Sequence, residues 1–383
     1  MKIDHDPMGR EERAALHDII NPTDLDRALT DKLVKTRPSG DGLTIYNYTD
    51  AAMRTPGAWD NPAVRACRGL IIHDITARVV ARPWAKFFNH GQTEAGALDM
   101  DSPVEVTDKL DGSLGIIHPR PDGTWAVATR GSFTSDQAVH ATAILDHYTF
   151  DHIAAKAWTL LVEIVYPGNR IVCDYGDRDE LVLLGAVHVD TGKAIGPHDA
   201  VEVTGWNGPT TDTFNYPTLA AAIAAPPRPG AEGFVVRYLN AEGQRLVKIK
   251  QADYVALHRI VTGLSEKTVW QHAMDGRPLH ELLTGVPDEL HGWIGDVWHN
   301  LRSNVDVAVS EVDGIYNSIM DDLDDVPTRK DFAIAVQNTD LEDPRYRAML
   351  FLRHDGRDVA AAALKTLKPV GDTRAKTITE DVA

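Results

Sequence analysis

The chain has 383 residues, more than one ordinary hydrophobic core accommodates, so its length predicts two domains. Apolar residues make up 43% of the chain and charged residues 25%, which is typical of a soluble globular protein, and no apolar run approaches the length of a membrane span. The net charge is −17 and both halves of the chain are acidic, which argues against a protein that binds nucleic acid through one broad basic face. A local basic groove in an acidic body stays open, because surface potential depends on how charges are distributed.

The start of the chain and its cysteines indicate the compartment. Residues 1–6 lack the apolar core of a secretory signal. Cys67 and Cys173 stand alone in apolar segments that we expect to be strands, so buried small residues are favoured over a disulfide or a metal site. These features predict a protein of the cytoplasm, bacterial or of a phage-infected host.

The first two thirds of the chain predict a mixture of short strands and helices. Residues 1–40 are expected to form a helical and loop lead-in, and residues 68–82 a hairpin that turns at 74–77. Residues 137–145 have helical spacing, and residues 220–230 predict a short helix followed by a loop. Further strands are predicted at 43–48, 158–165, 181–189, 232–238 and 245–250.

From Tyr254 onward the pattern becomes helical. Apolar residues recur every three or four positions from Leu290 to Ile319, which predicts one long amphipathic helix. Thr328 is placed to cap a further helix, and residues 346–367 also have helical spacing. We therefore expect a domain of residues 1–254 followed by an all-helical domain of residues 255–383.

One short motif suggests covalent chemistry. Lys109 lies where a predicted strand gives way to a turn, and Asp111, Gly112 and Ser113 follow it. This pattern offers an amine nucleophile, a carboxylate beside it and a glycine that lets the backbone approach a phosphate. Taken alone, a charged turn between two strands explains it better.

The charged residues around this motif strengthen the functional interpretation. Each lies within, or at the edge of, a short apolar segment that reads as a buried strand, and a buried charge is costly unless it is paired or used. Several such segments predict one polar pocket lined by strand ends. The residues are Arg68, Lys86, Arg130, Glu163, Glu232, Lys248 and Lys250.

The ordered series resembles the covalent nucleotidyltransferase superfamily of DNA ligases, RNA ligases and mRNA-capping enzymes. Within it, residues 66–69 and 82–89 ahead of Lys109, and residues 166–172 after Glu163, resemble the RNA ligase 1 family of phage tRNA-repair ligases. The resemblance covers roughly residues 40 to 255. Arg130 stands where family members often carry lysine, which keeps the charge but changes the hydrogen-bonding geometry.

The resemblance implies a fold and a set of roles. The fold is α+β: a nucleotidyltransferase (ATP-grasp-like ligase) domain of antiparallel sheets with flanking helices, followed by an all-helical domain. Lys109 would be the nucleophile that carries AMP, with Lys248 and Lys250 as further catalytic residues. The expected contacts to the nucleotide and its phosphates come from Arg68, Lys86, Asp111, Gly112, Arg130, Glu163, Glu232, Lys248 and Lys250.

Two physical requirements accompany these roles. Lys109 must lose its proton before it attacks phosphorus, which nearby cations, desolvation or a metal would favour. Glu232 and Glu163 are the expected ligands of Mg²⁺ (or Mn²⁺), directly or through water, because such a site needs only one or two carboxylates besides phosphate oxygens. Both could instead be structural partners of Arg68 or Lys248.

The function implied by the resemblance is ATP-dependent joining of RNA ends. Lys109 would take AMP from ATP and pass it to an RNA 5′-phosphate, and a 3′-hydroxyl would then displace AMP. The partners would be RNA, including nicked tRNA, and an end-healing kinase/phosphatase. A DNA ligase or a capping nucleotidyltransferase is an alternative, although the helical pattern after residue 255 speaks against both. A non-catalytic protein that binds nucleotides or RNA ends is a second alternative.

Overall fold

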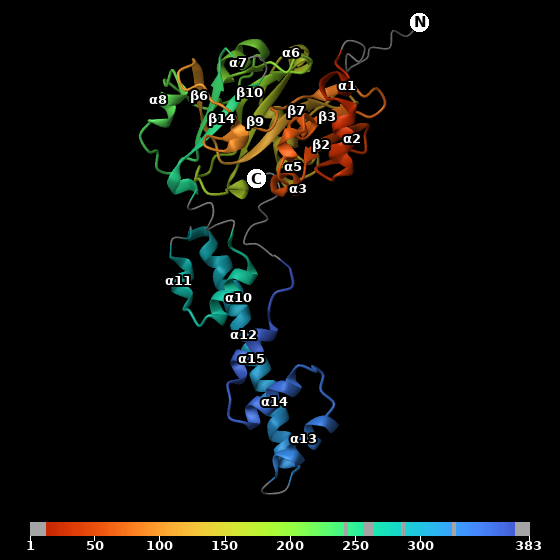
Figure 1. Ribbon diagram of the computed structural model, residues 1–383, viewed down its shortest axis with the longest axis vertical. Helices are drawn as coiled ribbons and strands as arrows, with labels where there is room; N and C mark the ends of the chain where they lie inside the picture. Colours follow the sequence, from red (N-terminus) through yellow and green to blue (C-terminus); the bar gives the residue numbers. More distant parts are fainter. Residues whose placement is uncertain are drawn as a thin grey trace. The chain divides into compact units, whose positions relative to one another are not determined.

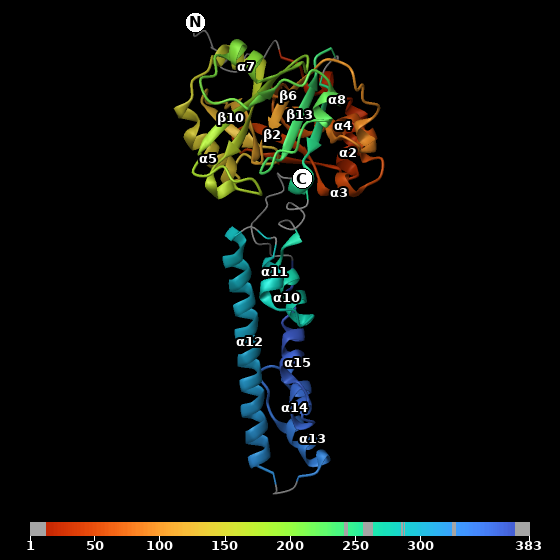
Figure 2. The same cartoon turned by 90° about the vertical axis from the view of Figure 1, so that its left-hand side faces the viewer.

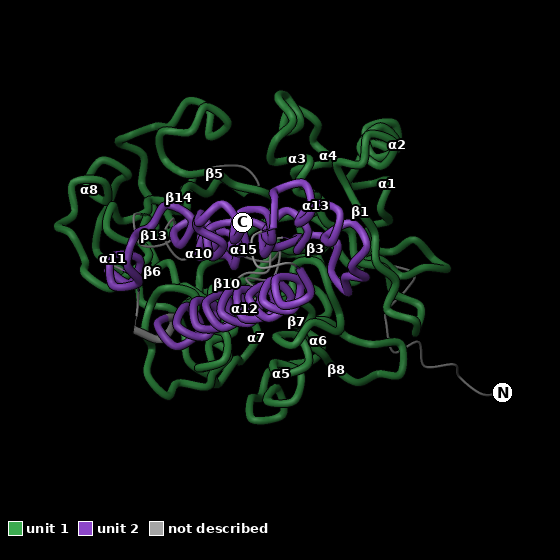
Figure 3. The backbone as a smooth tube through the Cα atoms, turned by 90° about the horizontal axis from the view of Figure 1, so that it is seen from below, with its two compact units in different colours: residues 1–256, 378–383 green, residues 257–377 purple. Residues whose placement is uncertain are grey.

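The computed structural model describes residues 13–240, 244–255, 263–284, 286, 288–323 and 327–371. Contacts within the chain divide it into two compact units, one within residues 1–256 and the other within residues 257–377 (Figure 3). Among the described residues, none of the helices has the length and apolar character that a membrane crossing needs. The division lies two residues from the domain boundary expected from the sequence, and the independence of the two domains stays a prediction.

The first unit contains three sheets and the helices that cover them (Figure 1). Its strands are β1 (Val34–Pro38), β2 (Leu43–Tyr48), β3 (Arg68–His73), β4 (Val79–Ala81), β5 (Phe88–Asn89), β6 (Val104–Lys109), β7 (Ser113–Pro119), β8 (Trp125–Thr129), β9 (Trp158–Val165), β10 (Glu180–His188), β11 (Ala194–Ile195), β12 (Thr213–Phe214), β13 (Gly233–Tyr238) and β14 (Leu246–Lys250). Its α-helices are α1 (Leu16–Ile19), α2 (Pro22–Thr30), α3 (Asp50–Arg54), α4 (Pro62–Ala66), α5 (Asp136–Ile144), α6 (His152–Ala157), α7 (Pro197–Thr204) and α8 (Leu219–Ile223).

The central sheet has the order β11-β10-β9-β7-β8 and is buried on both faces. Successive residues of a strand point to opposite faces, so a strand covered on both sides reads as a continuous apolar run, as β9 does. Leu161 packs toward the first sheet beside Ile45 and Ile71. Leu160 packs on the opposite face in a second core that includes residues of α5, α6 and α7. The sheet is therefore a rigid middle layer.

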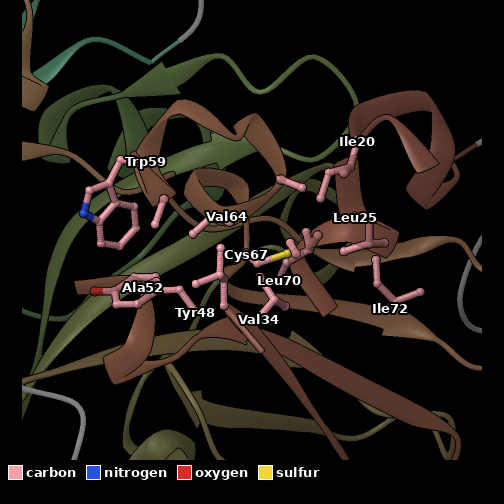
Figure 4. Close-up of a cluster of buried hydrophobic side chains, with 14 of the residues drawn as sticks. Ile20, Leu25, Val34, Tyr48, Ala52, Trp59, Val64, Cys67, Leu70 and Ile72 are labelled. Carbon is pink, nitrogen blue, oxygen red and sulfur yellow. The ribbon is translucent and has the colours of Figure 1, made fainter. Parts of the chain in front are cut away.

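The first sheet has the order β1-β2-β3-β4 and turns its other face to α2, α3 and α4. Figure 4 shows side chains of this core, with Tyr48 and Trp59 at one end of it. The third sheet has the order β12-β6-β13-β14-β5 and packs its apolar residues against α8. All its neighbouring strands are antiparallel except β14 and β5, which run parallel.

The second unit, as far as it is described, consists of helices: α10 (Glu266–Met274), α11 (Leu279–Leu283), α12 (Asp288–Asp321), α13 (Arg329–Asn338), α14 (Tyr346–His354) and α15 (Val359–Thr366). The long α12 runs beside α10, α14 and α15 (Figure 2). Ile294, Val305 and Val312 are buried on it, as the periodic apolar stripe predicts. Thr328 caps α13 by accepting a hydrogen bond from the backbone N–H of Asp331.

The predicted α+β class, the antiparallel sheets and the helical C-terminal region are confirmed. Two local expectations are wrong: the lead-in contains the strand β1, and the two cysteines do not lie in strands. The helical character of residues 346–367 is confirmed, as two helices with a break at residues 355–358. Cys67 and Cys173 are both buried, but Cys67 follows α4 and Cys173 lies in the irregular segment after β9. The part of the lead-in before residue 13 and the side chain of Leu290 lie outside the described residues.

Candidate active site

The register of the third sheet brings Lys109, Glu232 and Lys250 together. Lys109 is the last residue of β6, and Gly233, the first residue of β13, pairs with Lys109 on one side and Lys250 on the other. Glu232 immediately precedes Gly233. Its Oε2 atom lies 2.6 Å from Nζ of Lys109, and its Oε1 atom lies 3.0 Å from Nζ of Lys250. One buried carboxylate, 3% exposed, thus bridges two lysines.

This bridge sets the charge of Lys109. Burial by itself lowers the pKa of Lys109, but Glu232, Glu163 and Asp111 together outweigh it, so the pKa of the amine lies above its ordinary value. Burial by itself raises the pKa of Glu232, but Lys109 and Lys250 outweigh it and hold that pKa below its ordinary value. In the ligand-free protein Lys109 is therefore an ammonium ion. The expectation that its surroundings favour proton loss is wrong for this state, because the nearest charge is a carboxylate.

From the central sheet, Glu163 approaches the turn that follows Lys109. It lies in β9, and its Oε1 atom accepts a hydrogen bond of 2.9 Å from the backbone N–H of Gly112. Burial raises the pKa of Glu163 to about 7, against the opposing effect of Lys109. A Cβ atom on Gly112 would lie 2.6 Å from the carbonyl oxygen of Ile164, so only glycine allows the turn to come this close to β9.

Asp111 is turned into the wall of the site. Its Oδ2 atom accepts hydrogen bonds of 2.8 Å from the backbone N–H groups of Val172 and Cys173, and its Oδ1 atom accepts one of 2.7 Å from the hydroxyl of Tyr254. The Asp111 N–H donates to the hydroxyl of Tyr175 at 2.8 Å. Because the carboxylate is 3% exposed and already engaged, these contacts favour a positioning role over the phosphate contact expected from the sequence.

Three further cations lie close enough to repel one another. Arg68 opens β3, Lys248 lies in β14, and Lys86 lies between β4 and β5. Burial lowers the pKa of Lys248 well below its ordinary value, and Lys109, Lys86, Arg68 and Lys250 lower it further. Burial is also the main reason that the pKa values of Lys86 and Arg68 are lowered. Such a concentration of positive charge in a partly buried site suits a polyanionic ligand that supplies the missing counter-charge.

Arg130 joins this group through an aromatic residue that the sequence analysis did not select. It directly follows β8 and is 4% exposed. Its Nη1 atom donates a hydrogen bond of 2.6 Å to the hydroxyl of Tyr48, at the end of β2. Lys86 Nζ donates to the same oxygen at 3.4 Å. Arg130 and Lys86 therefore meet at one tyrosine hydroxyl, while Lys109 and Lys250 meet at Glu232.

The carboxylates of Glu232 and Glu163 are the candidate ligands of a divalent ion. Within the described ranges, no group of three or more His, Cys, Asp or Glu side chains is arranged to hold a metal. Glu232 and Glu163 supply two carboxylates, and the charge of each raises the pKa of Lys109. Two carboxylates completed by water and phosphate oxygens are the ligand set that Mg²⁺ commonly takes, so the residues present fit such an ion.

Sequence reasoning missed four aromatic residues that contact the predicted site residues, and the sequence holds a weak signal for one of them. Tyr254 follows Lys250 by four residues, within reach of the same strand end. Tyr48, Trp59 and Tyr175 come from distant segments, and nothing in their local pattern separates them from core aromatics. Asn169 accepts a hydrogen bond of 3.1 Å from the Ser113 hydroxyl.

Comparisons with known proteins agree with this chemistry. A family model described as RNA ligase matches residues 66–254. RNA ligase 1 of bacteriophage TS2126 is 25% identical over 257 residues, which cover 60% of this chain and 61% of the phage protein. A protein of Autographa californica nuclear polyhedrosis virus, whose name describes a bifunctional polynucleotide kinase/RNA ligase, is 28% identical over 225 residues, 52% of this chain and 32% of the viral protein. The chain thus spans less than two thirds of either relative.

Among solved structures, an archaeal ATP-dependent RNA ligase aligns with 88% of this chain and 96% of its own, with a TM-score of 0.43 and 12% identity. The family match begins two residues before Arg68 and ends at Tyr254, four residues after Lys250. This part of the chain, which carries every site residue predicted from the sequence, therefore matches the RNA ligase family model and is similar to the phage enzyme.

Proposed function

We propose that the chain is an ATP-dependent RNA ligase that joins a 5′-phosphate end to a 3′-hydroxyl end through AMP bound to Lys109. The observation that supports this most is the position of Lys109. Its partly buried amine lies 2.6 Å from Glu232, beside a group of cations, in a region that matches RNA ligases. A lysine amine next to a phosphate-binding pocket has the geometry of a covalent nucleotidyl-transfer site.

In the first step, Nζ of Lys109 bonds to the α-phosphorus of ATP, and the bond from that phosphorus to the pyrophosphate oxygen breaks. The amine gives up a proton before or during the attack, because an ammonium ion has no lone pair. Lys248 and Lys250 stabilise the negative charge that develops on the leaving pyrophosphate, as the cations of phosphoryl-transfer sites do. Gly112 brings the backbone of the nucleophile turn close to the nucleotide.

The carboxylates complete the nucleotide site. Glu232 and Glu163 would hold a divalent ion, Mg²⁺ or Mn²⁺, which when bound supplies positive charge to the phosphate oxygens and favours the unprotonated lysine. In the absence of an ion, Glu232 keeps Lys109 protonated through their ion pair. The protein therefore holds its nucleophile unreactive until Glu232 is drawn away from it.

In the second and third steps, the 5′-phosphate oxygen of an RNA end displaces Lys109 from AMP, and a 3′-hydroxyl then attacks the 5′-phosphorus with AMP as the leaving group. The expected setting is the repair of broken RNA, including nicked tRNA. Ends with other chemistry must first be converted to a 5′-phosphate and a 3′-hydroxyl, so we propose an end-healing kinase/phosphatase partner. The viral relative, whose name joins a polynucleotide kinase to an RNA ligase, supports that pairing.

The proposal is tested by incubating the protein with each α-labelled nucleoside triphosphate in Mg²⁺ or Mn²⁺ and detecting labelled protein by gel. Labelling by ATP alone is expected, followed by transfer to 5′-phosphorylated RNA and sealing. Labelling by GTP would indicate a capping enzyme, and preferential sealing of nicked DNA would indicate a DNA ligase. Binding of ATP without any labelled protein would indicate a non-catalytic nucleotide-binding protein, and the proposal would then be wrong.

A further inference from the structure

Tyr48 lies where the phosphate-binding cations converge. Its hydroxyl accepts hydrogen bonds from Arg130 at 2.6 Å and from Lys86 at 3.4 Å. Its ring is equally close to both charges: Cζ of Arg130 lies 4.8 Å, and Nζ of Lys86 5.1 Å, from the ring centroid. The side chain is 3% exposed. One tyrosine therefore contacts at least Arg130 and Lys86, which come from separate segments of the chain, through its oxygen and through its ring.

The tyrosine is itself held by an aromatic cluster. Trp59, labelled with Tyr48 in Figure 4, packs edge-on against Tyr48 with ring centroids 5.1 Å apart. Phe88 packs against Trp59 with ring centroids 5.5 Å apart. The Lys86 ammonium lies 5.2 Å from the Trp59 ring and 5.7 Å from the Phe88 ring, so it is surrounded by three aromatic rings. The backbone N–H of Tyr48 donates to the carbonyl of Cys67 at 2.7 Å, next to Arg68.

This arrangement answers a physical difficulty of the site. Cations that must bind one polyanion repel each other while the site is empty, and a flexible lysine loses rotamer entropy when it is held in place. Electron-rich ring faces attract ammonium and guanidinium groups, and a shared hydroxyl oxygen accepts from both. The contacts of Tyr48 therefore reduce the repulsion between Arg130 and Lys86 and fix their positions before the ligand binds.

We propose that Tyr48 is a positioning residue for the triphosphate of ATP, holding Arg130 and Lys86 in a preformed polyphosphate site. This inference rests on the proposed function. The pKa of Tyr48 agrees with it: burial by itself raises that pKa, but Arg130, Lys86 and Arg68 together outweigh burial and bring it below its ordinary value. The hydroxyl thus lies in a strongly positive field, which is the field that a triphosphate would meet.

The test compares two tyrosine-to-phenylalanine variants. Tyr48→Phe removes the shared oxygen and keeps the ring and its packing. Tyr238→Phe is a matched control, because Tyr238 is 6% exposed, donates a 2.7 Å hydrogen bond to the carbonyl of Asp99, and has Arg245 5.1 Å from its ring centroid. The measurements are the rate of AMP–protein formation against ATP concentration and the affinity for inorganic tripolyphosphate by calorimetry.

Tyr48→Phe is expected to raise the KM for ATP and the Kd for tripolyphosphate by at least tenfold, about 1.4 kcal/mol, with a smaller change in the maximal rate. Tyr238→Phe should leave both constants unchanged. Equal constants in Tyr48→Phe and the wild type, or equal losses in both variants, would overturn the inference.

The two readouts separate this inference from the proposed function. A wild type that forms no AMP adduct, yet binds tripolyphosphate in a way that Tyr48→Phe weakens, would refute the ligase proposal and support the role of Tyr48. A wild type that forms the adduct with an ATP dependence that Tyr48→Phe leaves unchanged would do the reverse. If the wild type itself does not bind tripolyphosphate, the inference of a preformed polyphosphate site is wrong.

Discussion

Glu232 bridges Lys109 and Lys250, and replacing it gives a prediction for protein stability and a separate one for activity. Glu232→Gln keeps the shape of the side chain but removes its charge. In the wild type, Lys109 and Lys250 share one carboxylate at 2.6 and 3.0 Å. In the variant they would face a neutral amide. Breaking a buried ion pair from one side costs about 3–5 kcal/mol. Since the two lysines are 19% and 25% exposed, water offsets part of that cost, and we expect the lower end, about 3 kcal/mol.

The pH dependence of this loss has a definite sign. The pKa of Lys109 is raised in the folded protein, so its ion pair stabilises the fold at pH values below the unfolded pKa of about 10.4. That contribution is lost as pH rises through the folded pKa, where the amine becomes neutral. The difference in unfolding free energy between wild type and Glu232→Gln is therefore expected to be full at pH 7 and to shrink above about pH 10.

The assay combines urea unfolding without ATP or metal with a measurement of AMP–protein formation. Glu105→Gln is the control: Glu105 pairs with Arg237 at 2.9 Å across the same two strands, β6 and β13, and is 17% exposed. Both variants are expected to lose stability. Only Glu232→Gln is expected to lose adduct formation, by about 10²–10³-fold, the loss typical of removing one charge-stabilising group, because it removes a carboxylate that would hold the divalent ion at the reacting site. An unchanged unfolding midpoint in Glu232→Gln, or adduct formation at the wild-type rate, would refute the reasoning.

Four further outcomes are expected. Lys109→Ala should abolish the AMP adduct and all sealing of 5′-phosphate ends, and adduct formation in this variant would place the nucleophile elsewhere. Gly112→Ala, whose Cβ would lie 2.6 Å from the carbonyl oxygen of Ile164, should slow adduct formation by displacing the nucleophile turn, which rate measurements at saturating ATP will check. Burial lowers the pKa of His118 to about 4. The free energy of unfolding should therefore fall by up to about 3 kcal/mol as the pH falls from about 6.5 to 4, and in urea titrations His118→Gln should lack this pH dependence. A soluble chain ending at Gly263 should still form the adduct but lose its preference for nicked tRNA over unstructured RNA; an unchanged ratio of sealing rates would assign the helical unit another role.

Alanine variants at the charged residues of the site are expected to differ in stability. Glu232→Ala should destabilise the fold, because the carboxylate is 3% exposed and neutralises two lysines. Loss of activity at this position must therefore be measured on folded protein. Lys248 differs, since burial and like charges already lower its pKa and its loss relieves repulsion.

The sequence by itself determined the local elements and the types of residue that carry the chemistry. The apolar run of β9 and the helical stripe on α12 are visible in it because burial selects apolar side chains with the period of the backbone. Thr328 marks the start of α13 because its side chain can satisfy the free N–H groups of a helix end. Charged residues such as Glu163 and Lys248 stand out in apolar strands because burying a charge costs free energy unless the charge is paired or has a function.

Only the tertiary structure decided how those charges act on one another. Lys109 and Glu232 are far apart in sequence, and the pairing of β6 with β13 makes them the closest ion pair of the site. Electrostatic effects depend on distance and burial, so the sign of the pKa shift of Lys109 could not be read from the residues near it in the chain. The same holds for Tyr48, whose place among the cations follows from the packing of β2 beside β3 and against Trp59, and from no pattern in its own segment.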